Sequence, residues 1–369
     1  MDANTKPPST TIAFPILAIA FVIFAPFIGF DAGAQPPSLS SLILSGAMIV
    51  IMLGAVFAAV HHADVIAHRV GEPYGTLVLT LAVTVIEVAL IESIVLTPGS
   101  SPALARDTVF AVIMVVCNGL VGLCVLWGGL RHHEQEFQAS GASVYLSVLG
   151  ALSILTLVLP NYTATAIGPY FSNGQLIFVS ITTVILYAAF LFIQMSRHSN
   201  YFRADAGNAL GENHAFPSDR SVAISAIMLL VALCGVILIA KKFAIILEIG
   251  LSRVGAPQAV AGIIIAMVVL TPESITAVRA ARRNELQKSL NLALGSSLAT
   301  IGLTIPAVAI TNIFLGNQIE LGLSARDTLL LALTLFLSLL TFGSGRTNIL
   351  AGLVHLVVFA TFLFLVFIP

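Results

Sequence analysis

The sequence has few charged residues. Aspartate, glutamate, lysine and arginine together make up only 9% of its 369 residues, whereas soluble domains carry about 25%. A chain this poor in charge cannot cover a surface that faces water. Hydrophobic residues make up 58% of the chain, and crossing a bilayer takes about 20 consecutive apolar residues. We therefore expect an all-α polytopic membrane protein whose principal partner is the lipid bilayer.

Cysteine is also scarce. The three cysteines, Cys117, Cys124 and Cys234, all lie in apolar runs. An odd number of cysteines inside membrane segments is not a disulfide framework. Without a CxxC pair or a Cys/His cluster, it is not a zinc site either. We expect packing roles and no cofactor. The net charge of −1 gives no reason to expect a nucleic-acid partner.

Eleven apolar stretches predict membrane helices, and little sequence remains outside them for a soluble domain. They lie near residues 11–30, 40–61, 74–96, 105–130, 143–160, 174–195, 220–240, 257–279, 286–311, 324–341 and 347–368. Residues 1–39 form an N-terminal tail and a leading helix. Ala32-Gly33-Ala34 resembles a signal cleavage site, but the apolar run before it exceeds the roughly 7–15 residues of a signal sequence. We expect the helix to be retained.

The basic residues predict an orientation. With a cytoplasmic N-terminus, eleven of the 16 lysines and arginines fall on the inner side and five on the outer side, Lys241 and Lys242 among the five. Lysine and arginine are enriched in cytoplasmic loops. The bias predicts a multi-pass inner (plasma) membrane protein with its N-terminus in the cytoplasm.

A short motif occurs twice along the chain. Arg69-Val-Gly-Glu-Pro73 recurs as Arg253-Val-Gly-Ala-Pro257. Each copy leads into an apolar helix with an acid near mid-depth, Glu87 or Glu273. The next helix has a small or polar break at its centre, at Asn118-Gly119 in the first copy and at Gly295-Ser296-Ser297 in the second.

The repeat unit contains five spans, so the second copy enters from the opposite face of the membrane. We predict one leading helix and two inverted five-helix repeats, residues 40–195 and 220–369, joined by a cytoplasmic linker over 196–219. Inverted repeats are common in secondary transporters with a site near the midplane. The alternative is that duplication only built a stable bundle.

Glu87 lies on one helix face with Thr80 and Thr84. A charged side chain at the bilayer centre costs about 2.5–3.5 kcal/mol on insertion scales. We therefore expect Glu87 to face protein or water and to hold a proton or a cation. Loss of water favours the protonated carboxyl group, and a nearby cation favours the ionised one. One acid can thus hold either in turn, as an antiporter requires. The alternative is a structural carboxylate paired with a neighbour.

Glu273 follows Pro272, which frees a backbone carbonyl one turn earlier. Thr271 and Ser274 add hydroxyl groups beside it. Oxygen ligands of this kind suit hard cations such as Ca²⁺ or Na⁺. Asn118, Ser296 and Ser297 are further candidate ligands, with interhelical contact as the alternative. For Thr84, Thr271 and Ser274 we expect hydrogen bonds to the carbonyl four residues earlier unless they reach the ion.

Three histidines, His61, His62 and His68, lie with Asp64 and Glu72 at a predicted helix end. Histidine titrates near neutral pH, so a pH sensor is the functional alternative. We expect a solvated membrane interface.

Two segments carry a family resemblance. The stretch from Glu72 to Val88 resembles the first repeat of bacterial ChaA-type calcium (sodium)/proton antiporters, within the cation/calcium exchanger superfamily. Thr271-Pro-Glu-Ser274, followed by residues 292–304, resembles the second repeat. The likeness runs from about His61 to the end of the chain.

The resemblance implies an inverted five-plus-five fold with one leading helix. It also implies that Glu87 and Glu273 carry the ion and the protons, with Asn118 and the Ser296-Ser297 pair lining the site. The superfamily often places Gly-Asn just before the acid. Here the matching pairs are Val83-Thr84 and Val269-Leu270, so the ligand set and the ion selectivity are expected to differ.

These observations predict a secondary antiporter that exchanges Ca²⁺ (or Na⁺ or K⁺) for protons, with Glu87 and Glu273 meeting at one midplane site. A cation/cation exchanger or a cation channel using the same site is the alternative. An enzyme is disfavoured. Ser296 or Ser297 could supply a nucleophile, but we expect no histidine at matching depth in another span to act as its base.

Overall fold

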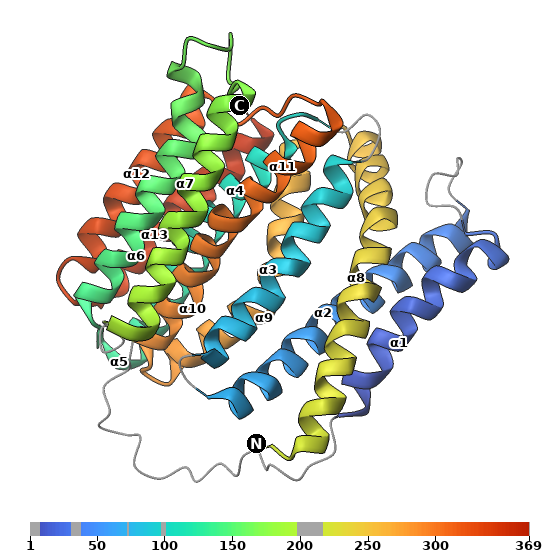
Figure 1. The fold of residues 1–369 in the computed structure, drawn as a ribbon. Helices are drawn as coiled ribbons and strands as arrows, with labels where there is room; N and C mark the ends of the chain where they lie inside the picture. Colours follow the sequence, from blue (N-terminus) through green and yellow to red (C-terminus); the bar gives the residue numbers. More distant parts are fainter. Residues whose placement is uncertain (1–7, 31–37, 72–73, 97–100, 198–216, 369) are drawn as a thin grey trace. The chain divides into compact units, whose positions relative to one another are not determined.

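The computed structural model describes residues 8–30, 38–71, 74–96, 101–197 and 217–368 (Figure 1). The predicted cleavage-like site and most of the predicted linker lie outside these residues. The helices are α1 (Ser9–Phe24), η1 (Ala25–Ile28), α2 (Leu39–Val70), α3 (Tyr74–Val95), α4 (Leu104–Met114), η2 (Val115–Leu120), α5 (Val121–His132), α6 (Ala139–Ser153), η3 (Ile154–Val158), η4 (Leu159–Tyr162), α7 (Asn173–Phe192), η5 (Ile193–Arg197), α8 (Asp219–Val254), α9 (Ala259–Arg282), α10 (Leu286–Ala299), η8 (Thr300–Thr304), α11 (Ile305–Leu315), α12 (Ala325–Phe342) and α13 (Ile349–Phe367). The strands are β1 (Glu134–Glu136) and β2 (Arg346–Asn348).

Several of these elements run into one another as single helices, such as α4-η2-α5 and α10-η8-α11. The described residues then form eleven helical segments, as the sequence predicts. Ten of the described helices are long and apolar enough to cross a membrane. The remaining one, α3, has 22 residues. The chain is a multi-pass membrane protein.

Two helices are longer than predicted. α2 has 32 residues and α8 has 36, which correspond to about 48 and 54 Å at 1.5 Å per residue. The predicted span ends at residues 61 and 240 were therefore wrong as helix ends, and Lys241 and Lys242 lie inside α8 rather than in a loop. Charge interrupts an apolar run but does not stop a helix. Both helices end at a glycine with positive φ, Gly71 and Gly255.

The helices divide into two compact units. The first unit holds α1, α2, α3 and α8. Glycines bring α1 close to its neighbours, because a Cβ on Gly54 of α2 would overlap the Phe14 ring and one on Gly235 of α8 would lie 2.8 Å from the Ala18 Cβ. The leading helix is thus packed into this unit.

His62 links three helices of the first unit. Its side chain is fully buried, with Nε2 3.0 Å from the Thr11 carbonyl of α1 and Nδ1 3.2 Å from the Ser225 hydroxyl of α8. The expectation of a solvated interface was therefore wrong for His62. It holds for His68, which is exposed and lies 3.8 Å from Asp64.

The second unit holds α4 to α7 and α9 to α13. Within it, helices from the two predicted halves interleave: α4 and α5 pack on α9, α5 also packs on α13, and α6 packs on α10 and α12 (Figure 1). The two strands join the connection before α6 to the one before α13, with Gln135 opposite Thr347. At the other end of α6, Tyr170 pairs with Glu320 in an isolated antiparallel bridge.

Side chains strengthen both of these connections. The buried Gln135 donates hydrogen bonds of 3.0 Å to the Ala281 carbonyl and to Asn284, where α9 turns into α10. At the opposite end, Arg106 pairs with Glu320 and donates to the Gly322 carbonyl at 2.9 Å. The helix that carries Glu273 is thus fixed at its C-terminal end to the connection after α5.

A π-helical turn interrupts each of the two helices for which the sequence predicts a central break. η2 contains Asn118 and Gly119, and all six of its residues are buried. η8 begins at Thr300, one turn after Ser296 and Ser297. π-helical turns are rare and frequently lie at functional sites.

Candidate functional site

Glu87 lies on α3 in the first unit, where this helix packs against α2 and α8. Its side chain is 2% exposed and that of Thr84 is 3% exposed. The Thr84 hydroxyl donates to the Thr80 carbonyl at 2.8 Å, which confirms the expected bond to the helix backbone. The Thr84 oxygen can still accept a bond or contact a cation, because its donated hydrogen leaves lone pairs on the oxygen.

Glu273 lies on α9 in the second unit, one residue after Pro272. The helix continues through the proline from Ala259 to Arg282, but the ring nitrogen of Pro272 cannot donate to the carbonyl of Val268. Thr271 donates to the Met267 carbonyl at 2.5 Å, again the expected backbone bond. Ser274, beside the acid, is half-buried.

One carboxyl oxygen of Glu273 lacks a partner in the part of the chain that the structure describes. The carboxyl group lies beside the hydroxyl of Ser296 on α10. Its Oε2 is buried and has no hydrogen-bond partner among the described residues. An unsatisfied buried polar atom costs roughly 1–3 kcal/mol, and more when it carries charge. A proton on this oxygen, or a cation beside it, removes that cost.

Ser297, next to Ser296, faces the other way, towards η2. Its fully buried hydroxyl contacts the Cys117 thiol, and two turns away Cys124 contacts Ser289. Residue numbers rise along one helix as they fall along the other, so α10 crosses η2 and α5 in the antiparallel sense. Cys117 and Cys124 are buried free thiols, in keeping with the packing roles predicted for them, whereas Cys234 on α8 is exposed, contrary to the expectation.

Asn118 joins η2 to two other helices. Its Nδ2 donates to the Thr334 hydroxyl of α12 at 2.8 Å, and its Oδ1 lies 3.1 Å from Nδ1 of His355 on α13. This is the interhelical contact that the sequence offered as the alternative to ligation. A role for the Asn118 side chain in lining an ion site stays a prediction, as does the meeting of Glu87 and Glu273.

Comparison with known proteins identifies the family. The profile of the sodium/calcium exchanger protein family matches residues 40–196 and 224–368. The chain belongs to the sodium/calcium exchanger family. This confirms the resemblance seen in the sequence, and the chain is accordingly a transporter and not an enzyme.

The exchanger has relatives of similar length. It is 46% identical over 320 residues to the putative ionic transporter y4hA of Sinorhizobium fredii (strain NBRC 101917 / NGR234). This alignment covers 86% of this chain and 87% of that protein. It is 36% identical over 367 residues to the sodium-potassium/proton antiporter ChaA of Escherichia coli (strain K12), covering 99% and 98%. Among solved structures, the Ca²⁺/H⁺ antiporter protein YfkE shares the fold with a TM-score of 0.71 at 18% identity, covering 97% and 100%.

Sequence reasoning missed one residue of this exchanger. We expected no histidine at the depth of the serines, and this was wrong, since His355 is fully buried against Asn118. Its Nε2 lies 3.0 Å from the Thr341 hydroxyl, so both ring nitrogens are engaged and neither is placed as a base for Ser297. A histidine within the apolar run of α13 was the signal, because ionisable residues inside membranes are functional by default.

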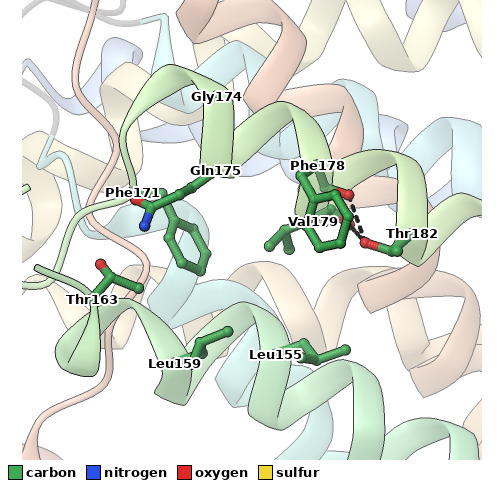
Figure 2. Close-up of a pocket in the computed structure, with 9 residues that line it drawn as sticks. All are labelled: Leu155, Leu159, Thr163, Phe171, Gly174, Gln175, Phe178, Val179 and Thr182. Carbon is green, nitrogen blue, oxygen red and sulfur yellow. Dashed lines mark hydrogen bonds between the residues drawn. The ribbon is translucent and has the colours of Figure 1, made fainter. Parts of the chain in front are cut away.

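A groove in this exchanger lies apart from all of these residues. It encloses about 470 Å³ where η3 and η4 meet the start of α7 (Figure 2). The Thr182 hydroxyl in its wall donates to the backbone of α7, and the remaining surface is almost entirely apolar. So apolar a lining does not suit a metal cation. The groove is lined by Leu155, Leu159, Thr163, Phe171, Gly174, Gln175, Phe178, Val179 and Thr182.

Proposed function

We propose that this cation/proton antiporter exchanges a hard metal cation for protons at Glu87 and Glu273, each of which binds cation and proton in turn. The observation that carries the proposal is the carboxyl group of Glu273. It sits inside a membrane helix, beside the Ser296 hydroxyl, with Oε2 buried and unsatisfied. Such an oxygen is stable with a proton or a cation as its partner.

Competition for the same carboxyl groups supplies the coupling. A cytoplasmic cation binds the deprotonated acids and leaves outward, and protons then bind the acids it vacated. A cation and a proton cannot occupy one carboxylate together. The outward movement of the cation is therefore coupled to the inward movement of protons on the same carboxyl groups. The bias of lysine and arginine supports an inner-membrane location with the N-terminus in the cytoplasm.

Several pairs of contacts support two inverted halves. The matched family segments, residues 40–196 and 224–368, nearly coincide with the predicted repeats. Gly119 in η2 faces the Phe359 ring of α13, and Gly302 in η8 faces the Tyr187 ring of α7. In the two predicted halves, η2 corresponds to η8 and α7 corresponds to α13. The two contacts are therefore equivalent when the halves are exchanged. The same exchange relates the β1–β2 ladder to the Tyr170–Glu320 bridge at the opposite end of α6.

The proposed oxygen ligands favour a hard metal cation as the transported ion. Carboxylate and hydroxyl oxygens suit Ca²⁺ and Na⁺ alike, and the sequence predicts Ca²⁺ first. Na⁺ and K⁺ are the second candidates, because the relative that aligns over nearly the whole chain is named a sodium-potassium/proton antiporter. Adding Ca²⁺, Na⁺, K⁺ and Mg²⁺ in turn to acid-loaded everted vesicles, with a fluorescent reporter of internal pH, distinguishes them.

The same assay tests the mechanism. Glu273→Gln keeps the shape of the side chain but cannot ionise, so we expect it to abolish proton movement on cation addition. Glu134→Gln, at an exposed glutamate of β1, serves as the control and should behave like the parent. Full exchange by Glu273→Gln would refute the assignment. Cation uptake without proton movement in the parent would instead support a channel or a cation/cation exchanger.

A further inference from the structure

We propose that His355 is a positioning residue for the cation site: it holds the Asn118 amide, and through the π-helical turn η2 it fixes Ser297 and, with it, the neighbouring Ser296 that faces Glu273. The inference rests on the proposed role of Glu273. It assigns a function to a buried histidine on α13, the last described helix, that is not itself a candidate ligand.

Close packing brings His355 to η2. A Cβ on Gly352 of α13 would lie 2.9 Å from the Gly122 carbonyl and 2.6 Å from the Leu126 nitrogen, so the backbones of α13 and α5 are in contact. A Cβ on Gly122 would lie 3.2 Å from that of His355. Small residues on both helices therefore set the depth at which the imidazole meets Asn118.

The hydrogen bonds around His355 have a fixed direction. The Thr334 hydroxyl donates to the Leu330 carbonyl at 2.8 Å, so it accepts from Nδ2 of Asn118. The Asn118 oxygen then faces His355 and can only accept, which places a hydrogen on Nδ1 of the imidazole. Nε2 carries no hydrogen in the neutral ring and accepts from the Thr341 hydroxyl.

A backbone group supports the same assignment. The Cys117 carbonyl also lies beside the His355 ring, and a carbonyl can only accept. The ring of Phe342 stacks beside the imidazole with centroids 6.3 Å apart. The partners of His355 named here are all uncharged, so the neutral ring with its hydrogen on Nδ1 satisfies them.

The same turn leads from His355 to the acid. Cys117 precedes Asn118 in η2 and contacts Ser297, while Ser296 contacts Glu273. Four consecutive contacts thus join the five elements α12, α13, η2, α10 and α9. Residues behind the ligands typically fix their orientation, and replacing such residues costs about 10–100-fold in metal affinity or activity. His355 lies behind Ser296 and Glu273 in this sense, and we expect it to fix their orientation.

Three substitutions separate positioning from simple packing. His355→Asn places an amide near the position of Nδ1 and can still donate to Asn118. His355→Gln reaches only the position of Nε2, and His355→Leu supplies neither bond. We expect His355→Leu and His355→Gln to raise the cation concentration for half-maximal proton flux by about tenfold or more. His355→Asn should stay close to the parent.

Separate measurement of the half-saturating cation concentration and of the maximal flux tests whether His355 has a positioning role. A positioning role changes the half-saturating cation concentration, with the maximal flux per folded molecule largely retained. Equal half-saturation for all three variants and the parent would overturn the inference, and so would a fall in maximal flux alone. If His355→Leu does not fold, the comparison of His355→Asn with His355→Gln still decides.

A spectroscopic measurement is independent of transport. In ¹⁵N-histidine-labelled protein in liposomes, the signals lost in His355→Asn identify His355. We expect them to report hydrogen on Nδ1 and a bare Nε2, and Thr341→Val to shift the Nε2 signal. Hydrogen on Nε2 would overturn the inference. Exchange by Glu273→Gln would defeat the proposed function whatever the spectrum, whereas normal behaviour of every His355 variant would defeat this inference alone.

Discussion

The hydroxyl of Ser296 lies beside the carboxyl group of Glu273 at the interface between α10 and α9. The first prediction tests this contact. Ser296→Ala removes a donor to the carboxylate, and bonds to charged groups contribute about 1.5–3 kcal/mol. We expect the half-saturating cation concentration to rise roughly tenfold, since 1.4 kcal/mol corresponds to a factor of ten. The measurement is a cation titration of proton flux in everted vesicles.

Ser289→Ala is the matched control for that experiment. Ser289 is a buried serine on the same helix, but it contacts Cys124 and not Glu273. Its replacement should leave the titration curve in place. An unchanged curve for Ser296→Ala, or an equal shift for Ser289→Ala, would contradict the role given to Ser296.

The second prediction concerns Glu87. If Glu87 and Glu273 serve one exchange cycle, Glu87→Gln abolishes cation-dependent proton movement, and the double variant behaves like either single one. Residues that act as a unit are non-additive in this way. Proton flux for the three variants is the measurement. Half-activity in each single variant with none in the double variant would show two independent routes.

The third prediction concerns the packing of α1 in the first unit. Gly54→Ala places a methyl group where the Phe14 ring lies, and overpacking a close contact typically costs about 1–3 kcal/mol. We expect a lower unfolding temperature in detergent. Gly46→Ala is the control on the same helix, because nothing lies within 4 Å of its added Cβ. Equal unfolding temperatures for the two variants would contradict the contact.

The fourth prediction concerns the connection between β1 and the end of α9. A Cβ on Gly128 would overlap the Gln135 side chain, so Gly128→Ala displaces the amide that donates to Ala281 and Asn284. Each broken bond leaves a buried group unsatisfied, at about 1–3 kcal/mol. We expect a lower unfolding temperature than for Gly150→Ala, whose added Cβ meets its nearest atom at 3.9 Å. A stability equal to that of the control would show that Gln135 relocates freely.

The sequence predicted the helices and the acid-bearing segments because each depends on local composition. Apolar length defines a span, and a glutamate inside such a span is conspicuous at Glu87 and Glu273. The central break at Asn118-Gly119 was also visible as small and polar residues, and the break predicted at Gly295-Ser296-Ser297 lies in the last turn of α10, just before η8. The family matches and the described helices confirm this level of the fold.

Other features depend on contacts between distant segments, which composition does not record. Lys241 marks a change of polarity, but the helix continues because nothing there disturbs its backbone. His62 is close to other polar residues along the chain, yet α1 covers it. His355 reaches Asn118 because Gly122 and Gly352 allow two backbones to touch, and that contact spans more than two hundred residues of sequence.

The hydrogen-bonded chain from Thr341 through His355 to Asn118 has no net charge. A membrane potential acts on net charge, at about 2.3 kcal/mol per elementary charge for each 100 mV. Voltage therefore does no work on this support, whatever its depth in the bilayer. Any dependence of exchange on membrane potential reports the charge moved by the carboxyl groups and the transported ions. Once the charge of the cation is known, counting that moved charge gives the number of protons that enter for each cation that leaves.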